Sequence, residues 1–179
     1  NPVEHTLSPL IHNFLAEELG INMVYVPFHV EQGQLAHAVK GAYGLHILGC
    51  NVTVPYQNEV LEQLADIDML AKRIGAVNTL VRIENGYKGY NTDMTGLLRA
   101  MQSDGVEIAG EDIVILGAGG VARAVAFMCV AYGAKKVYML NRTIEKAQQI
   151  AEEVNKSFET DVVCTMALSE YMKLPQKKY

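Results

Sequence analysis

The sequence predicts an α/β protein built from two successive units, and two observations carry this prediction. First, β-branched and aromatic runs alternate with runs whose apolar residues recur at helical spacing, and the alternation restarts near residue 112. Second, a glycine-rich turn at 117–120 directly follows the first apolar run after that restart. Strand, glycine turn and helix in this order are typical of a Rossmann fold. We therefore expect one domain over 1–95 and a Rossmann domain over 96–179.

In the first unit, Ser8 is expected to cap a helix, because Pro9 follows at the first helical position, and Gly20 ends that helix. Further strands and helices alternate along the chain, which predicts a parallel sheet with crossover helices. The expected strands lie at 23–30 and 46–54, and the expected helices at 34–43, 57–65 and 68–74.

The run VNTLVRIENGYKGYN at 77–91 predicts a β-hairpin that turns at Asn85-Gly86, and a helix is expected at about 93–104. After residue 112 the runs DIVIL, KKVYMLN and DVVCT predict three strands joined by two helices. We expect both chain ends to be incomplete, because no strand precedes NPVEHTLSP and no helix or strand follows LPQKKY.

Composition excludes several classes of protein. The net charge is −5 and no run of Lys or Arg occurs, which argues against binding to nucleic acid. The 3 cysteines lack ligand spacing, so we expect reduced, buried thiols and no metal site. No signal peptide opens the chain, and the most apolar stretch, 113–134, is broken by glycines and Arg123. A soluble cytoplasmic protein without membrane contact is expected.

The glycine turn predicts a dinucleotide site. Glycines permit the tight turn, allow backbone N–H groups to approach a pyrophosphate and place it at a helix N-terminus. The alternative is a tight turn between strand and helix that binds no nucleotide. The expected cofactor contacts are Gly117, Ala118, Gly119, Gly120 and Val121.

The end of the next strand favours NADP over NAD. Asn141 stands where an NAD enzyme keeps a carboxylate for the ribose 2′-hydroxyl. Arg142 and Thr143 follow, and a guanidinium can pair with a 2′-phosphate. The alternative interpretation makes Arg142 a solvated charge and Thr143 the cap of the helix at 144–155.

Small polar residues accompany several strand ends of the first unit. Each one has an ordinary structural interpretation: Ser8 as a helix cap, Thr53 as a strand residue, Asn78 as a turn residue and Asp93 as a cap. Together they predict a pocket rich in hydrogen-bonding groups with one carboxylate, suited to a polyhydroxylated ligand.

Five motifs in order resemble the shikimate dehydrogenase family across essentially the whole chain: NPVEHTLSPLIHN, GCNVTVPYQ, IGAVNTL, GYNTDMTG, and GAGGVARA with NRT. The resemblance implies a three-layer αβα substrate domain followed by a Rossmann domain whose C-terminal part lies beyond this chain. It implies NADP-dependent reduction of 3-dehydroshikimate to shikimate, an oxidoreductase reaction of aromatic amino-acid biosynthesis. Only a small-molecule substrate is implied as a partner, with a monomer or a homodimer as the assembly.

The resemblance also assigns residues. The family's carboxylate-binding serine pair corresponds to Thr6 and Ser8, and its hydroxyl-binding positions correspond to Thr53, Asn78 and Asp93. The family's catalytic lysine, which pairs with the aspartate at position 93, corresponds to Gln57.

A glutamine amide can donate a hydrogen bond, but it neither titrates nor carries charge, so we expect impaired catalysis. Three accounts of Gln57 remain: an engineered substitution, a natural variant of low activity, or a paralogue that binds without catalysing. A quinate/shikimate dehydrogenase and a dehydrogenase acting on methylene-tetrahydrofolate are the other candidate functions, although the NVTVP and NTD motifs argue against the second.

Overall fold

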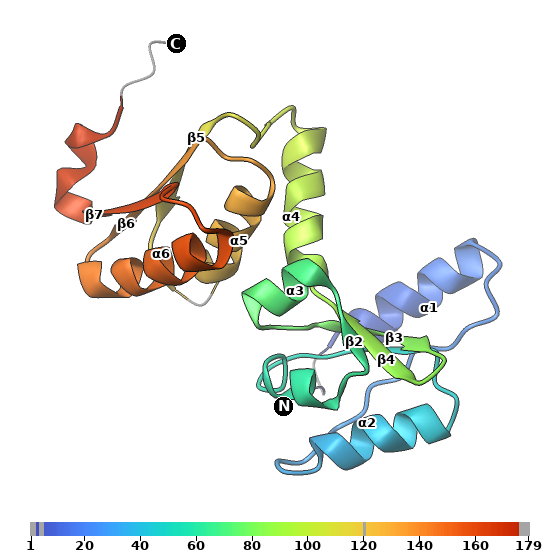
Figure 1. Ribbon diagram of the computed structural model, residues 1–179. Coiled ribbons are helices and arrows are strands. Elements are labelled where there is room, and N and C mark those ends of the chain that lie inside the picture. The colour runs from blue at the N-terminus through green and yellow to red at the C-terminus, as the bar shows by residue number, and fades with distance from the viewer. Residues whose placement is uncertain (1–2, 4–5, 120, 176–179) are drawn as a thin grey trace.

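The computed structural model describes residues 3, 6–119 and 121–175, and it contains two separate sheets (Figure 1). This arrangement confirms the predicted α/β class. Helix α4 (Thr92–Ser103) carries the chain from the first sheet to the second. The predicted division after residue 95 falls inside this helix.

The first sheet has the strand order β1-β3-β4-β2. Its strands are β1 (Gly49–Asn51), β2 (Asp66–Ile67), β3 (Thr79–Ile83) and β4 (Gly86–Tyr90). Only β2 and β4 run parallel, whereas β1 with β3 and β3 with β4 are antiparallel. The predicted parallel sheet is therefore wrong for the first unit. The predicted hairpin is present, because the turn at Asn85-Gly86 folds β4 back onto β3.

Two further predictions for the first unit are wrong. Residues 23–30 form no strand, and the strand predicted at 46–54 shrinks to three residues. The 23–30 run has β-forming residues, but no strand among the described residues pairs with it, and a strand without a partner leaves its backbone groups unsatisfied. The helix predicted at 57–65 is a 3₁₀ helix, η1 (Glu59–Gln63).

The remaining helices of this unit are α1 (Ser8–Glu18), α2 (Leu35–Gly44) and α3 (Met69–Ile74). Ser8 does not cap α1, because Leu7 occupies that position without a side-chain bond. Asp68 caps α3 by accepting from Leu70 N at 3.0 Å and from Ala71 N.

The second sheet is parallel, in the order β5-β6-β7. The strands are β5 (Asp112–Leu116), β6 (Lys136–Asn141) and β7 (Val163–Ala167), and the helices between them are α5 (Ala122–Ala131) and α6 (Ile144–Phe158). A 3₁₀ helix, η2 (Leu168–Lys173), follows β7. This order confirms the predicted Rossmann-type βαβαβ arrangement.

Two apolar clusters hold the units together. The first contains Tyr56, Val60, Val77, Leu80 and Tyr87 around the first sheet. The second surrounds α5, α6 and the parallel sheet, and it also takes in Ile74 of α3 and Met94 and Leu98 of α4. Helix α3 therefore contributes to both cores, through Ala71 to the first and Ile74 to the second, and α4 contributes to the second.

The cysteines match their prediction only in part. Cys129 is buried, whereas Cys50 and Cys164 are half-buried, and all three are free thiols. Burial raises the pKa of the Cys129 thiol to about 11. Among the described helices, none combines the length and the apolar character needed to cross a bilayer.

Candidate functional site

Polar residues at the ends of three strands of the first sheet, with the predicted Asn78 among them, lie side by side. Asn51, at the end of β1, lies opposite Thr79, at the start of β3, and Thr79 lies opposite Tyr90, at the end of β4. Backbone bonds extend this register, from Val52 N to Asn78 O at 2.8 Å and from Asn78 N to Tyr90 O at 3.0 Å. The residues that follow β1 and β4, and the one that precedes β3, are thereby brought together.

Asn78 is the most constrained residue of this edge. It is 8% exposed, and its Oδ1 accepts from Thr92 N at 2.9 Å, Thr92 Oγ1 at 3.0 Å and Thr79 Oγ1 at 2.9 Å. Three donors on one oxygen fix the orientation of the amide. None of these hydrogen bonds uses Nδ2 as a donor.

A run of side-chain contacts links this residue to the start of α1. Asn51 Nδ2 donates to Thr79 Oγ1 at 3.2 Å, and Tyr25 Oη donates to Asn51 Oδ1 at 3.1 Å. Thr6 Oγ1 donates to Ser8 Oγ at 3.1 Å, and Ser8 beside the Tyr25 hydroxyl lowers the pKa of Tyr25, against the larger rise caused by burial. We call this set of linked residues the polar edge: Thr6, Ser8, Tyr25, Asn51, Asn78, Thr79 and Thr92.

The polar edge thus joins three of the predicted substrate residues, Thr6, Ser8 and Asn78. Sequence reasoning missed the four residues that connect them. Three of them lie within the motifs described above, one or two positions from a predicted residue: Asn51, Thr79 and Thr92. Their closeness to predicted residues is the signal by which the sequence could have identified them. Tyr25 offered no comparable signal, because the predicted strand at 23–30 gave it an ordinary structural role.

Three predicted residues lie outside the polar edge. Thr53 is exposed. Gln57 is half-buried, with its backbone oxygen accepting from Val77 N at 2.8 Å and its Nε2 donating to Val52 O at 3.2 Å. Asp93 is exposed in the first turn of α4. Among the described residues no hydrogen bond joins Gln57 to Asp93.

The cap of α4 is Asn91, not Asp93 as its ordinary interpretation predicted. Asn91 Oδ1 accepts from Met94 N at 3.4 Å, and its Nδ2 donates to Ala76 O at 3.2 Å. The carboxylate of Asp93 is therefore not used by the helix terminus.

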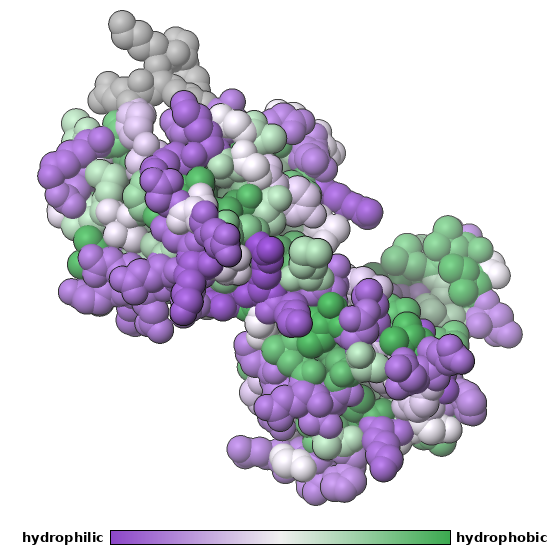
Figure 2. Space-filling view, in the orientation of Figure 1, coloured by the Kyte–Doolittle hydropathy of each residue, from purple (hydrophilic) through white to green (hydrophobic). Residues whose placement is uncertain are grey.

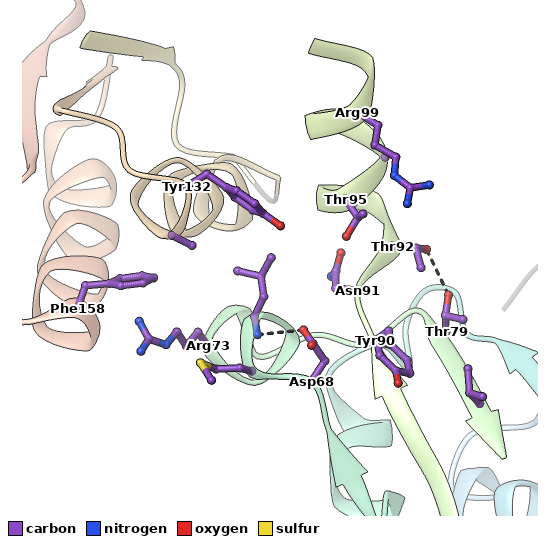
Figure 3. Close-up of a pocket in the computed structure, with 15 residues that line it drawn as sticks. Asp68, Arg73, Thr79, Tyr90, Asn91, Thr92, Thr95, Arg99, Tyr132 and Phe158 are labelled. Atoms are coloured by element: carbon purple, nitrogen blue, oxygen red, sulfur yellow. Dashed lines mark hydrogen bonds between the residues drawn. The ribbon is translucent and has the colours of Figure 1, made fainter. Parts of the chain in front are cut away.

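A cavity of about 1000 Å³ lies between α3, α4 and the C-terminal ends of α5 and α6 (Figure 3). Thr79, Asn91 and Thr92 line it, but none of the predicted site residues does. Arg73 stacks on Phe158 with its guanidinium 4.1 Å from the ring centroid, and Arg99 extends from α4 in another direction (Figure 3). The two cations do not converge on one anion.

In the second unit, the glycine turn lies at the carboxyl edge of the parallel sheet. Gly117 has φ of +109°, which disfavours other residues, and its N–H donates to Leu140 O at 2.7 Å. A β-carbon at Gly117 or Gly119 would meet no atom within 4 Å, so the space before the turn is open. Ala118 packs against the second core and Val121 is exposed just before α5, whereas Gly120 lies outside the described residues.

Asn141, which ends β6, and the two residues after it lie at the same edge, because Leu116 and Leu140 are register partners. Asn141 Nδ2 donates to Thr143 O at 2.7 Å, which closes the turn. Thr143 occupies the cap position of α6, but its hydroxyl makes no cap bond. Arg142 is exposed.

Arg123 connects α5 to α6 and to the end of α3. Its Nε pairs with Glu153 Oε2 of α6 at 2.7 Å, and its NH1 donates to the carbonyl of Ile74 at the end of α3. Asn58 Nδ2 donates to the next carbonyl, Gly75 O, at 2.6 Å. The helix that begins at the glycine turn is thus bonded to the segment that leads to Asn78.

This geometry agrees with the comparisons with known proteins. Residues 1–80 match the sequence model of the shikimate dehydrogenase substrate binding domain, and residues 99–174 match that of shikimate / quinate 5-dehydrogenase. Shikimate dehydrogenase (NADP(+)) of Moorella thermoacetica is 46% identical over 84% of this chain and 51% of that protein. Its counterpart from Halothermothrix orenii is 39% identical over 99% of this chain and 62% of that protein.

A solved structure shows the same arrangement of elements. Shikimate 5-dehydrogenase from Listeria monocytogenes, in complex with shikimate and NAD, has a TM-score of 0.87 and 31% identity, covering 97% of this chain and 61% of that one. The chain spans between 51% and 62% of the lengths of these three proteins.

Proposed function

This chain belongs to the shikimate dehydrogenase family, and we propose that it is part of an NADP-dependent enzyme that reduces 3-dehydroshikimate to shikimate. The observation that carries the proposal is the polar edge. It offers hydroxyl groups at one end and the amide of Asn78 at the other, and Arg123 bonds its supporting segment to the glycine-turn helix. In this proposal residues 1–95 bind the substrate and residues 96–179 contribute to the cofactor site.

In the substrate site, Thr6 and Ser8 bind the carboxylate, because each hydroxyl can donate to it once Thr6 Oγ1 turns away from Ser8 Oγ. Asn78 Nδ2 donates to a ring hydroxyl, and Thr53 and Asp93 bind further hydroxyls. The exposed carboxylate of Asp93 accepts hydrogen bonds, since the helix does not use it.

In the cofactor site, the turn residues Gly117, Ala118, Gly119, Gly120 and Val121 receive the pyrophosphate at the start of α5. Asn141 leaves room for a 2′-phosphate, and Arg142 with Thr143 pairs with it. NADPH held there would supply the hydride for the substrate carbonyl, and the proton for the carbonyl oxygen would come from solvent, because Gln57 does not titrate.

Gln57 limits this chemistry. Its Nε2 donates one hydrogen to Val52 O and keeps a second for another acceptor, but the amide has no proton to give up. Because positioned acid–base groups contribute roughly 10²–10⁴ in rate, we expect low activity. Asp93 also lacks a cationic neighbour at position 57.

The test is a steady-state assay of NADP reduction by shikimate, on the full-length protein and on its Gln57→Lys variant. The variant should turn over at least roughly tenfold faster. Gln149→Lys, on the exposed face of α6, controls for added charge and should change nothing. Equal rates for the parent and the Gln57→Lys variant would remove position 57 from proton handling. Absence of shikimate and NADP binding in both would overturn the proposed function.

A second candidate is a protein that binds shikimate or quinate without catalysing, and the neutral, backbone-bonded Gln57 favours it. Mixing the NADPH-bound parent with 3-dehydroshikimate in a single-turnover experiment separates the candidates. Loss of NADPH absorbance in the parent protein supports the enzyme, whereas binding without any absorbance change supports the second candidate. The same assay with quinate as substrate in the oxidative direction reports the preferred acid.

A further inference from the structure

The stretch IGAVN, residues 74–78, runs from the end of α3 to the start of β3, and we call it the IGAVN segment. It is bonded at two points to the turn that carries Gln57. Asn58 Nδ2, next to Gln57, donates to the carbonyl of Gly75 at 2.6 Å. The backbone N–H of Val77 donates to Gln57 O at 2.8 Å. The position of Gln57 therefore depends on this segment.

The IGAVN segment also supports the start of α4. Asn91, the cap of this helix, donates from Nδ2 to Ala76 O at 3.2 Å. Asn78, the last residue of the segment, accepts through Oδ1 from Thr92 N at 2.9 Å. Asp93 follows in the first turn of the helix. The position of Asp93 therefore depends on the same segment as that of Asn78.

Arg123 bonds this segment to the helix that begins at the glycine turn. It is the second residue of α5, and its Nη1 donates to the carbonyl of Ile74. The same nitrogen lies 3.8 Å from the position that a β-carbon on Gly75 would take. Its Nε pairs with Glu153 Oε2 of α6 at 2.7 Å, and its guanidinium carbon lies 4.7 Å from the centroid of the Phe127 ring. Contacts from α3, α5 and α6 thus hold the guanidinium against the first residues of the segment.

The place of Arg123 in its own helix is unfavourable. The N–H groups in the first turn of a helix carry partial positive charge, which repels a cation. Arg123 occupies such a position in α5. Ile74 is the last residue of α3, and carbonyls at the end of a helix carry partial negative charge. The favourable contact at the end of α3 offsets the unfavourable position in α5, which indicates that the role of this arginine is the link between the two helices.

We propose that Arg123 is a positioning residue, which sets where the IGAVN segment lies relative to the cofactor helix. In hydride transfer the reacting atoms of cofactor and substrate must come within about 3–3.5 Å of each other. Ligands this close contact each other, so each stabilises the binding of the other when the two halves of the site are correctly placed. Without Arg123, each half still binds its own ligand, but the contact between the ligands is lost. This inference rests on the proposed function, in which the two units bind shikimate and NADP.

The experiment is calorimetric titration of the full-length protein and its Arg123→Met variant with shikimate, in the absence and presence of saturating NADPH. Shikimate and NADPH are both reduced, so no hydride passes between them during the titration. In the parent, NADPH should lower the dissociation constant of shikimate at least roughly fivefold. In Arg123→Met this factor should fall below about twofold, while the dissociation constant of each ligand alone should change less than about threefold.

Lys156→Met is the matched control, because it also replaces a cation with methionine beside Glu153, but on the exposed surface of α6. It should keep the factor of the parent. The titrations with a single ligand report whether each half of the site is still folded. A general loss of structure is thereby distinguished from a loss of coupling between the ligands.

Three outcomes would overturn the inference and leave the proposed function intact. The first is a factor in Arg123→Met equal to that of the parent, and the second is a parent in which NADPH leaves the shikimate affinity unchanged. The third is an Arg123→Met variant that has lost binding of either ligand alone, which would make the arginine a structural residue. Absence of shikimate and NADPH binding in the parent would instead remove the proposed function together with this inference.

Discussion

Helices α1 and α5 are almost equally long, at 11 and 10 residues, yet they are buried very differently. Only Ala16 of α1 is buried, whereas α5 buries Ala126, Phe127, Met128 and Cys129. Apolar side chains gather on the surface over α1 (Figure 2). The second unit is therefore held by a packed core, while the N-terminal part of the first depends on side-chain hydrogen bonds.

The difference follows from topology. In the second sheet, consecutive strands pair through consecutive crossover helices, so each apolar run finds its partner nearby in the sequence. In the first sheet, β1 skips β2 to pair with β3, and β2 pairs with β4. The first unit thus needs contacts between segments far apart in the chain, and Arg123 and the ends of α3 and α4 connect it to the firmer second unit.

The largest expected difference between the two units is in the loss of stability when one phenylalanine of each is replaced by alanine. Phe127 is 2% exposed, so Phe127→Ala in the 179-residue chain should lower the free energy of unfolding by about 3–5 kcal/mol. Phe14 is 58% exposed, and Phe14→Ala should change it by less than about 0.5 kcal/mol. Urea unfolding followed by circular dichroism measures both. A comparable loss at Phe14 would show that the apolar face of α1 is covered in solution.

The residues at two helix N-termini give a smaller contrast in stability. Here the larger loss is expected at α4, which leaves the first sheet, and the smaller loss at α6 of the second unit. Asn91 bonds Met94 N and Ala76 O, so Asn91→Ala should cost about 1–2 kcal/mol of stability. Thr143 makes no cap bond with its side chain, and Thr143→Ala should cost less than about 0.5 kcal/mol. Urea unfolding measures both variants. Equal losses of stability in Asn91→Ala and Thr143→Ala would contradict the assignment of the caps.

The smallest effect is expected from a surface ion pair of the first sheet. Lys88 Nζ lies 2.8 Å from Asp66 Oδ2, and the hydrogen bond from Lys88, followed by that from Ile67 N, lowers the pKa of Asp66. A carboxyl with a lowered folded pKa adds stability above its unfolded pKa of about 3.9, and this is lost as pH falls through the folded value. Stability measured from pH 7 to pH 2 should therefore show a slight deficit for Asp66→Asn at neutral pH that disappears in acid. A deficit that grows in acid would contradict this sign.

The sequence predicts the second unit well because its signals are local. An apolar run, a glycine turn and a helical pattern lie next to one another, and Gly117 and Asn141 stand where these patterns imply. The hairpin at Asn85-Gly86 was readable for the same reason. In contrast, the 23–30 run has the composition of a strand, and whether such a run pairs depends on a partner elsewhere in the chain.

The candidate site shows the same limit. Thr6, Ser8 and Asn78 could be selected because they stand in motifs. The hydrogen bonds that join them cross large separations in sequence, such as 26 residues between Tyr25 and Asn51 and 28 between Asn51 and Thr79. The contact of Gln57 with Val52 O likewise depends on the turn between them, which the residue types alone do not determine.

The central claim, that shikimate binds the first unit and NADP the second, is tested most directly by calorimetric titration of two variants of the full-length protein. Asn78→Asp keeps the oxygen that accepts three hydrogen bonds but removes the NH₂ donor, while Gly117→Val strains a turn with φ of +109°. We predict that Asn78→Asp weakens shikimate at least roughly tenfold and leaves NADP unchanged, and that Gly117→Val does the reverse. Loss of both ligands in both variants, despite intact folding, or retention of both ligands would contradict the claim.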